Sequence, residues 1–344
     1  MSLLVDIKKK LKGFSLEAEF KTEGEYLGIL GASGSGKSMI LKCIAGVETP
    51  DEGKIELNGK ILFDSEKKIN LKPQERNIGY SFQNYALFPH MTIEENIGLG
   101  LNCSKQEKEK RISKMISTFR LEGLEKKYPN HLSGGQQQRA ALARCIIYKP
   151  DLLLLDEPFS ALDSHLKEQL QTEVLDLLKL YKGEVLLVTH SRDEAYRFCK
   201  NLVIVDKGQV VMFGGTKEIF KQPKLLPAAR LTGCKNISKC EVINSHSIHA
   251  IDWKINLETN EEVNQNIKYV GIRAHDFKII DIKDDSTPNS YSFKVVKIVE
   301  DVFEYNIILG NNILYKVKKE EWDSIDHQDT INLFVPKEAI LLLE

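Results

Sequence analysis

Two hydrophobic patterns follow one another along this chain. In the first part, short runs in which every residue is apolar, such as Leu152–Leu155 and Val185–Val188, alternate with longer segments of helical spacing. A short, wholly apolar run is typical of a strand buried on both faces of a parallel sheet. Between Leu166 and Leu177, apolar residues instead recur at helical spacing, which predicts a long amphipathic helix. The alternation of the two patterns predicts an α/β domain.

The pattern changes after a linker that is flanked by Pro223 and Pro227. From about residue 233 onward, the sequence predicts short strands separated by turn residues. We therefore predict two domains, residues 1–232 and residues 233–344, the second being a small all-β barrel or sandwich of the OB-like kind. The strands expected in it are 247–251, 267–272, 291–299, 304–309, 313–317 and 331–335.

Local signals in the first domain predict further elements. Residues 3–8 and 15–20 alternate as two short strands, and Asn58-Gly59 between apolar runs predicts a hairpin. Two hydroxyl residues are each followed three positions later by glutamate, a pattern typical of helix N-termini. These are Thr92 with Glu95 and Ser104 with Glu107, and they predict helices over 92–99 and 105–118.

A glycine-rich loop joins one predicted strand to one predicted helix. Residues Gly31–Ser38 match the phosphate-loop pattern, with the apolar run 26–30 before them and 39–45 after them. Backbone N–H groups of such a loop converge on phosphate oxygens, and the helix N-terminus adds positive potential. We expect Lys37 to reach the β- and γ-phosphates and Ser38 to ligate magnesium. The alternative is a glycine-rich turn that binds no ligand. Such a turn would not need a lysine and a hydroxyl residue placed between a strand and a helix in this order.

The phosphate loop predicts that a nucleotide binds here, but it does not decide which reaction the nucleotide serves. Kinases, GTPases and motor ATPases all share this loop. Asp156 and Glu157 directly follow Leu152–Leu155, and His190 follows the next apolar run. The carboxyl ends of parallel strands meet at one sheet edge, where ligands bind. Phosphoryl transfer needs positioning and charge neutralisation, so lysine, a metal, a carboxylate near water and a histidine donor suffice. His190 alone would more often be a satisfied strand-end histidine, but this ordered set favours a functional role.

Composition narrows the classes of partner. The chain has 48 Lys+Arg and 49 Asp+Glu, a formal net charge of −1, so no overall basic field indicates nucleic acid. The six cysteines are scattered without C-x-x-C spacing, which favours reduced and mostly buried thiols. The first residues lack the apolar core of a signal peptide, and no run approaches the ~20 apolar residues that span a bilayer. We therefore expect any membrane role to come through a partner.

The order of motifs resembles the ATP-binding subunits of ABC transporters. After the phosphate loop come Gln83, Leu132-Ser-Gly-Gly-Gln136, the pair Asp156-Glu157, the turn Ser160–Asp163 and His190. The resemblance covers about residues 1–230, and its most specific part is Leu-Ser-Gly-Gly-Gln. It implies a phosphate-loop ATPase domain with a mostly parallel central sheet, an antiparallel β subdomain and a helical subdomain.

The resemblance also implies roles for individual residues. Asp156 looks like the carboxylate that holds magnesium, and Glu157 looks like the base that orients the attacking water. His190 resembles the switch histidine that contacts the γ-phosphate. Gln83 resembles the glutamine that senses metal and water near the permease, so the implied metal residues are Ser38, Gln83 and Asp156. The implied ATP-contacting residues are Phe14, Gly31, Ser33, Gly34, Ser35, Gly36, Lys37, Ser38, Met39, Gln83, Ser133, Gly134, Gly135, Gln136 and Asp163.

Two positions depart from the family pattern. Met39 stands where threonine is common, which puts one hydroxyl contact to the α-phosphate in doubt. The adenine-stacking aromatic is usually tyrosine, and Phe14 is the candidate here; a phenylalanine at a strand end is the alternative. Ser133–Gln136 would cover the γ-phosphate bound by a second copy of the chain.

Within the family, the chain resembles the ATPases of importers. Segments 271–273 and 334–338 look like the TOBE (molybdate-binding-like) domain, and 229–237 looks most like molybdate and sulfate importers. The resemblance implies ATP and Mg²⁺ as cofactors and import of an oxyanion such as molybdate, tungstate or sulfate. Iron, polyamine or sugar importers share the architecture and remain alternatives. The tail could bind an oxyanion effector.

The implied location is the cytoplasmic face of the membrane, through permease subunits, with an extracellular solute-binding protein as an indirect partner. We expect Tyr85, Leu87 and Phe88, after Gln83, to be exposed and to line the permease contact.

A soluble ABC ATPase of DNA repair would need a long coiled-coil insertion, and too few residues separate Ser38 from Leu132 for one. A translation factor of this class would usually carry two nucleotide domains, and a pure binding module would not turn over ATP.

Overall fold

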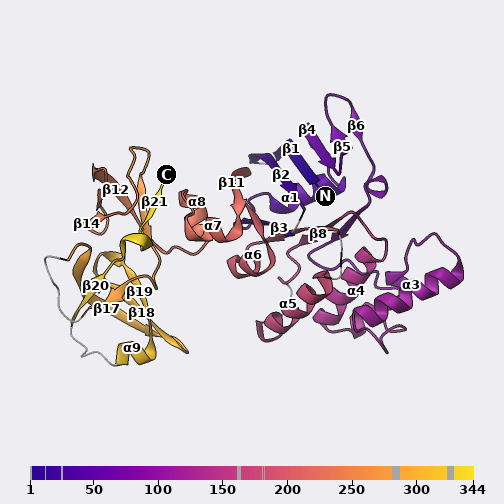
Figure 1. The fold of residues 1–344 in the computed structure, drawn as a ribbon. Helices are drawn as coiled ribbons and strands as arrows, with labels where there is room; N and C mark the ends of the chain where they lie inside the picture. The colour runs from indigo at the N-terminus through magenta and orange to yellow at the C-terminus, as the bar shows by residue number, and fades with distance from the viewer. Residues whose placement is uncertain are drawn as a thin grey trace. The chain divides into compact units, whose positions relative to one another are not determined.

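The chain folds into two compact units, residues 1–216 and 217–344, which are described separately (Figure 1). The computed structural model describes residues 2–11, 13–24, 26–160, 164–179, 181, 183–280, 287–323 and 329–344. Within this part of the chain, no helix is both long and apolar enough to cross a membrane.

One large mixed sheet organises the first unit. Its strand order is β6-β5-β4-β1-β2-β11-β10-β3-β9-β8-β7. The strands β10, β3, β9, β8 and β7 pair in parallel, whereas β1, β2, β4, β5 and β6 pair antiparallel. The mostly parallel centre and the antiparallel part are therefore confirmed. The strands are β1 (Ser2–Leu11), β2 (Phe14–Glu23), β3 (Tyr26–Gly31), β4 (Glu52–Leu57), β5 (Lys60–Asp64), β6 (Ile69–Asn70), β7 (Ile78–Ser81), β8 (Leu152–Asp156), β9 (Glu184–Thr189), β10 (Asn201–Asp206) and β11 (Gln209–Gly215).

Apolar cores cover both faces of the parallel part of the sheet. Leu152 and Leu154 of β8 face a core that includes α1, and Leu153 and Leu155 face a core that includes α4 and α5. Alternate residues of a strand point to opposite faces, so a strand covered on both sides needs an apolar residue at every position. The helices of the unit are α1 (Lys37–Ala45), α2 (Ile93–Ile97), α3 (Lys105–Thr118), α4 (Gly134–Ile146), α5 (Ser164–Lys179) and α6 (Arg192–Phe198).

Local signals set several element ends. Thr92 forms the expected capping box with Glu95, but α2 ends at Ile97, earlier than expected, because Gly98 caps it. At α3, the Ser104 hydroxyl accepts the expected bond from the Glu107 backbone N–H. Asn58 and Gly59 both adopt positive φ between β4 and β5, as a tight hairpin requires.

The second unit contains two five-stranded sheets, ordered β14-β13-β12-β15-β21 and β16-β20-β17-β18-β19. Both contribute to one apolar core, so the expected all-β architecture is confirmed. The strands are β12 (Asn236–Asn244), β13 (Ser247–Ala250), β14 (Ile255–Glu258), β15 (Tyr269–Ile272), β16 (Lys278–Ile279), β17 (Ser290–Glu300), β18 (Glu304–Leu309), β19 (Leu314–Lys318), β20 (Thr330–Phe334) and β21 (Leu341–Leu343). The short helices are α7 (Thr216–Lys221), α8 (Leu226–Leu231) and α9 (Lys319–Asp323).

The boundary between the units lies earlier in the chain than residue 232. Segment 217–232 packs with the second unit because Arg273 donates to the carbonyl oxygens of Phe220 and Thr232. The backbone N–H of Leu226 also donates to the carbonyl of Glu344. The prolines of the expected linker therefore belong to a folded segment.

The cysteines follow the expectation of reduced, mostly buried thiols. All six are free, and all except the half-buried Cys103 are buried. Burial raises the pKa of Cys43 to about 12 and that of Cys145 to about 11. Both thiols therefore stay protonated and unreactive at neutral pH.

A buried arginine ties the phosphate-loop helix to the strand that leads to Gln83. Arg76 is 1% exposed. Its Nη1 donates to the carbonyl oxygens of Cys43 and Ile44 at 2.8 Å each, its Nε to that of Leu71 at 2.9 Å, and its Nη2 to Asn70 Oδ1 at 2.9 Å. The carbonyls at the end of α1, which no helical N–H can satisfy, thus receive a charged donor.

Replacing Arg76 with leucine should lower the free energy of unfolding by about 3 kcal/mol, because the Leu71, Cys43 and Ile44 carbonyls lose a charged donor. Denaturant titration measures the change. Arg192 is exposed, and among the described residues its side chain pairs with its neighbour Asp193, so it provides a matched control that should change stability little. Equal effects of the two substitutions would contradict the anchoring role of Arg76.

Candidate active site

The phosphate loop lies between β3 and α1, as the sequence predicts. Gly36 precedes α1 in the left-handed conformation, with φ of 101°, and its carbonyl accepts the N–H groups of Met39 and Ile40. A Cβ at Gly36 would lie 2.9 Å from Leu16 Cδ1 and 3.5 Å from Phe14 Cε2. Only glycine therefore fits both the backbone angle and the available space.

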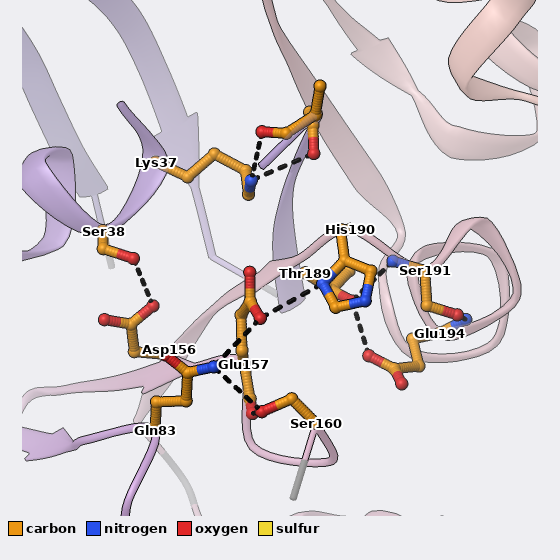
Figure 2. Close-up of polar contacts among 12 residues, drawn as sticks. Lys37, Ser38, Gln83, Asp156, Glu157, Ser160, Thr189, His190, Ser191 and Glu194 are labelled. Atoms are coloured by element: carbon orange, nitrogen blue, oxygen red, sulfur yellow. Dashed lines mark hydrogen bonds and ion pairs between the residues drawn. The ribbon is translucent and has the colours of Figure 1, made fainter. Parts of the chain in front are cut away.

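Lys37 is buried at the centre of this loop. Its Nζ donates to the carbonyl oxygens of Gly31 at 3.0 Å and Ala32 at 2.8 Å (Figure 2). Burial lowers the pKa of Lys37, and the nearby carboxylates of Glu157 and Asp156 act in the opposite direction. The ammonium group is thus held inside the curve of the loop, where phosphate oxygens could replace its carbonyl partners.

The Asp156 carboxylate lies at the carboxyl end of β8 and is 6% exposed. Its Oδ1 accepts the Ser38 hydroxyl at 2.8 Å, and its Oδ2 accepts the Tyr80 hydroxyl at 2.9 Å. Sequence reasoning placed Ser38 and Asp156 together but missed Tyr80. Tyr80 pairs with Leu154 in the parallel ladder between β7 and β8, and only this strand order reveals that it reaches Asp156.

Glu157 turns away from the strand, with φ of 44°, while its N–H donates to the Val188 carbonyl at 3.0 Å. Its Oε2 lies 3.1 Å from His190 Nδ1 and accepts Gln83 Nε2 at 3.4 Å. Gln83 also donates to the Ser160 hydroxyl oxygen at 3.3 Å. Figure 2 shows these side chains converging below Lys37. The structure thus brings Gln83 to the Glu157 carboxylate, and Asp156 has different hydrogen-bond partners.

Support for His190 comes from a buried network at the end of β9. The Thr189 hydroxyl donates to Glu194 Oε2 at 2.5 Å and accepts the Ser191 N–H at 2.9 Å, while Gln171 Nε2 donates to Glu194 Oε1 at 3.3 Å. This network fixes the turn between β9 and α6. His190 itself is 50% exposed, so its ring faces the open side of the site.

The Leu-Ser-Gly-Gly-Gln segment lies at the start of α4. Ser133 and Gln136 form a capping box, in which each side chain accepts the other residue's backbone N–H. Ser133 and Gly134 are exposed, whereas Gly135 is buried. Among the hydrogen bonds of the described residues, none joins Ser133–Gln136 to the phosphate loop of the same chain.

The remaining expected contacts differ in their surroundings. Phe14 is half-buried beside Gly36 and Gly208, at the edge of the phosphate loop. Met39 packs partly against the core beneath α1. Within the loop, Ser33 and Gly34 are exposed and Ser35 is buried. Asp163 lies outside the described residues.

A groove, here called the Phe88 groove, opens beside β7 and has a volume of about 610 Å³. Phe88 is 48% exposed, but the expectation that Tyr85 is exposed is wrong, since it is 5% exposed. Tyr85 and Ala86 adopt positive φ, and Arg144 donates to both of their carbonyls, which turns Tyr85 inward. Leu87 is partly buried against the α4 core. The groove is lined by Pro73, Gln74, Asn77, Ile78, Gly79, Tyr80, Phe82, Ala86, Phe88, Leu99, Gly100, Arg144, Cys145, Tyr148 and Pro150.

The oxygen ligands at this site suit magnesium. Ser38 and Asp156 offer one hydroxyl and one carboxylate, and the described residues hold no cluster of three or more His, Cys, Asp or Glu that could bind a metal. Magnesium in nucleotide sites is typically held by one or two protein oxygens together with water and substrate phosphates. The residues present therefore fit a metal that arrives with a nucleotide.

Comparisons with known proteins agree with this geometry. Residues 13–160 match the ABC transporter family model. The chain is 30% identical to the sulfate/thiosulfate import ATP-binding protein CysA of Synechocystis sp., over 97% of this chain and 93% of that protein. It is 33% identical to the spermidine/putrescine import ATP-binding protein PotA of Clostridioides difficile, over 92% of each. A dimeric ATP-binding cassette in a post-hydrolysis state, bound to ADP and Pi, matches with a TM-score of 0.52 and 29% identity, over 63% of this chain and 99% of that one.

The chain belongs to the ABC transporter family and is an ATP-hydrolysing import subunit. The resemblance of the sequence to the ATPases of ABC importers is thereby confirmed.

Gly36→Ala should weaken ATP binding about tenfold, because backbone strain and the contact with Leu16 displace the loop N–H groups. Equilibrium binding of ATP measures the effect. Gly123→Ala is the control: Gly123 also has positive φ, at 80°, but a Cβ there meets nothing within 4 Å. It should cost stability without changing ATP affinity, and an equal loss of affinity would contradict the prediction.

Proposed function

We propose that this chain powers import of an oxyanion, such as molybdate, tungstate or sulfate, at the cytoplasmic face of the membrane. One observation supports its catalytic role: the two adjacent carboxylates have different partners. Asp156 accepts a hydrogen bond from Ser38, whereas Glu157 contacts Gln83 and His190. The near full-length similarity to a sulfate/thiosulfate import ATP-binding protein supports an oxyanion as the solute. The similarity to a spermidine/putrescine import ATP-binding protein makes a polyamine the alternative solute.

The phosphate loop binds the nucleotide in this proposal. Lys37 exchanges its two carbonyl partners for β- and γ-phosphate oxygens, and the loop N–H groups and α1 N-terminus bind further oxygens. Ser38 and Asp156 hold magnesium, which neutralises phosphate charge when bound. Phe14 lies beside the loop, where its ring could stack on adenine.

Glu157 orients the attacking water and accepts its proton. Its left-handed backbone turns the carboxylate away from Asp156 and toward Gln83 and His190. His190 donates a hydrogen bond toward the γ-phosphate, and Gln83 positions the water and responds to the metal. These donors act by fixed position, which suits a reaction whose transition state mainly spreads charge.

A second copy completes each site. Ser133, Gly134 and Gln136 form an accessible helix start that makes no hydrogen bond to its own phosphate loop among the described residues. We propose that this segment covers the γ-phosphate bound by the partner copy. The dimeric state of the similar ATP-binding cassette supports this arrangement.

Glu157→Gln should retain ATP and magnesium binding, because shape and one hydrogen-bonding oxygen are kept. Hydrolysis should fall by ~10²–10⁴-fold, the usual loss when a general base is removed. Phosphate release measures hydrolysis, and gel filtration should show an ATP-dependent dimer. Hydrolysis at the unmodified rate would contradict the assignment of Glu157.

The shared site needs its own control. Adding Ser133→Arg to Glu157→Gln should prevent the dimer through steric and charge conflict at the exposed start of α4. ATP binding to the phosphate loop should persist. A double variant that still dimerises with ATP would contradict the role of Ser133–Gln136.

We further propose that permease subunits dock in the Phe88 groove, while an extracellular binding protein delivers the solute. Phe88→Glu should uncouple transport and leave basal ATP hydrolysis unchanged, because a charge disrupts an apolar contact surface. Reconstituted transport and ATPase assays separate the two effects. Phe213→Glu, which changes a similarly exposed aromatic of β11, should leave transport intact. Loss of ATP binding in Phe88→Glu would instead assign Phe88 to the folded core.

We propose that residues 233–344, together with segment 217–232 that packs with them, form a TOBE-like regulatory domain that senses oxyanion. A pocket of about 180 Å³ in the second unit supports this; Lys221, Lys224 and Lys337 line it, together with Glu261 and Glu338. Calorimetry of the full chain with molybdate, tungstate and sulfate should show binding that Lys224→Gln weakens. Absence of heat with all three anions would leave this domain a purely structural or dimerising role.

A further inference from the structure

The Asp156 carboxylate is oriented by two hydroxyl groups from different elements. Ser38, on α1, holds Oδ1 at 2.8 Å, and Tyr80, on β7, holds Oδ2 at 2.9 Å. A nearly buried carboxylate with one donor could rotate, whereas donors on both oxygens fix its plane. If the Ser38 hydroxyl ligated magnesium instead, the Tyr80 bond would remain to orient Asp156.

The sheet fixes how Tyr80 reaches Asp156. Tyr80 pairs with Leu154, which faces the same core as Asp156 because the two are separated by two positions on β8. The phenol therefore extends along this face toward the end of the neighbouring strand.

The same tyrosine also belongs to the Phe88 groove. β7 is the last strand of the sheet order, and Tyr80 and Phe82 both line the groove. Their ring centroids are 4.3 Å apart, and the Cys145 thiol donates to the Tyr80 carbonyl at 3.4 Å. A side chain that enters the groove and presses on Phe82 would thus act on a residue bonded to Asp156.

We infer that Tyr80 is a positioning residue that presents Asp156 to magnesium and links this carboxylate to the Phe88 groove. The inference rests on the proposed roles of Asp156 and of the groove. It adds a second connection between the nucleotide site and the docking surface, distinct from the Gln83 side chain, which bonds Glu157 and Ser160.

The test uses Tyr80→Phe in the full-length Glu157→Gln protein, in which ATP should bind and hydrolysis should be strongly reduced. Calorimetric titration of ATP at varied magnesium should show about a tenfold higher magnesium requirement, the usual scale for losing a group that orients a metal ligand. ATP affinity in EDTA should not change. Tyr181→Phe is the matched control, because its equally half-buried phenol donates to the Pro150 carbonyl at 2.8 Å. It should lower the thermal unfolding midpoint and leave the magnesium requirement unchanged.

Three outcomes decide the inference. An unchanged magnesium requirement in Tyr80→Phe would overturn the positioning role, provided that Asp156→Asn raises the requirement; if Asp156→Asn also has no effect, the proposed role of Asp156 fails. Phe82→Leu should raise the requirement by a smaller factor through the ring contact. No change in Phe82→Leu would overturn the link to the groove.

Discussion

The parallel pairing of β3, β8 and β9 is the constraint on which the candidate site depends. These strands end at the same edge of the sheet, so Lys37, Asp156, Glu157 and His190 meet there although they are far apart in the chain. Apolar cores on both faces hold the strands in register. Lys37 and Asp156 are nearly buried at this end of the sheet, and a buried charge is costly unless it has partners.

The two adjacent carboxylates, Asp156 and Glu157, are stabilised in two different ways. Asp156 is nearly buried and has a hydroxyl donor on each oxygen. Glu157 leaves the strand through a left-handed backbone and lies closer to solvent, next to His190 and Gln83. The Asp156 charge is thus held by neutral donors on both oxygens, and the Glu157 charge lies where water can reach it, as its proposed role as a base requires.

Anchoring of the phosphate loop extends well beyond the loop. Arg76 binds the carbonyls at the far end of α1, and its own segment continues into β7, which carries Tyr80 toward Asp156. The loop helix and the Asp156 carboxylate are therefore both connected to one edge strand. That strand also lines the Phe88 groove, so the nucleotide site and the candidate docking surface share structural elements.

The sequence by itself determined the parts of this protein in which one local pattern has one physical meaning. Gly31–Ser38 specifies a strand, a turn and a helix because glycine, lysine and hydroxyl must occur in that order around a phosphate, and Leu152–Leu155 specifies a strand covered on both faces. The sequence pattern did not predict strand β12. Its buried positions include Asn236, Ser238 and Cys240, and small polar residues satisfied by hydrogen bonds produce no apolar alternation.

Only the tertiary structure decided that Tyr80 meets Asp156 and that Tyr85 points inward. The first depends on which strands are neighbours, and the second on a distant arginine that binds the backbone, and neither relation is encoded in local spacing.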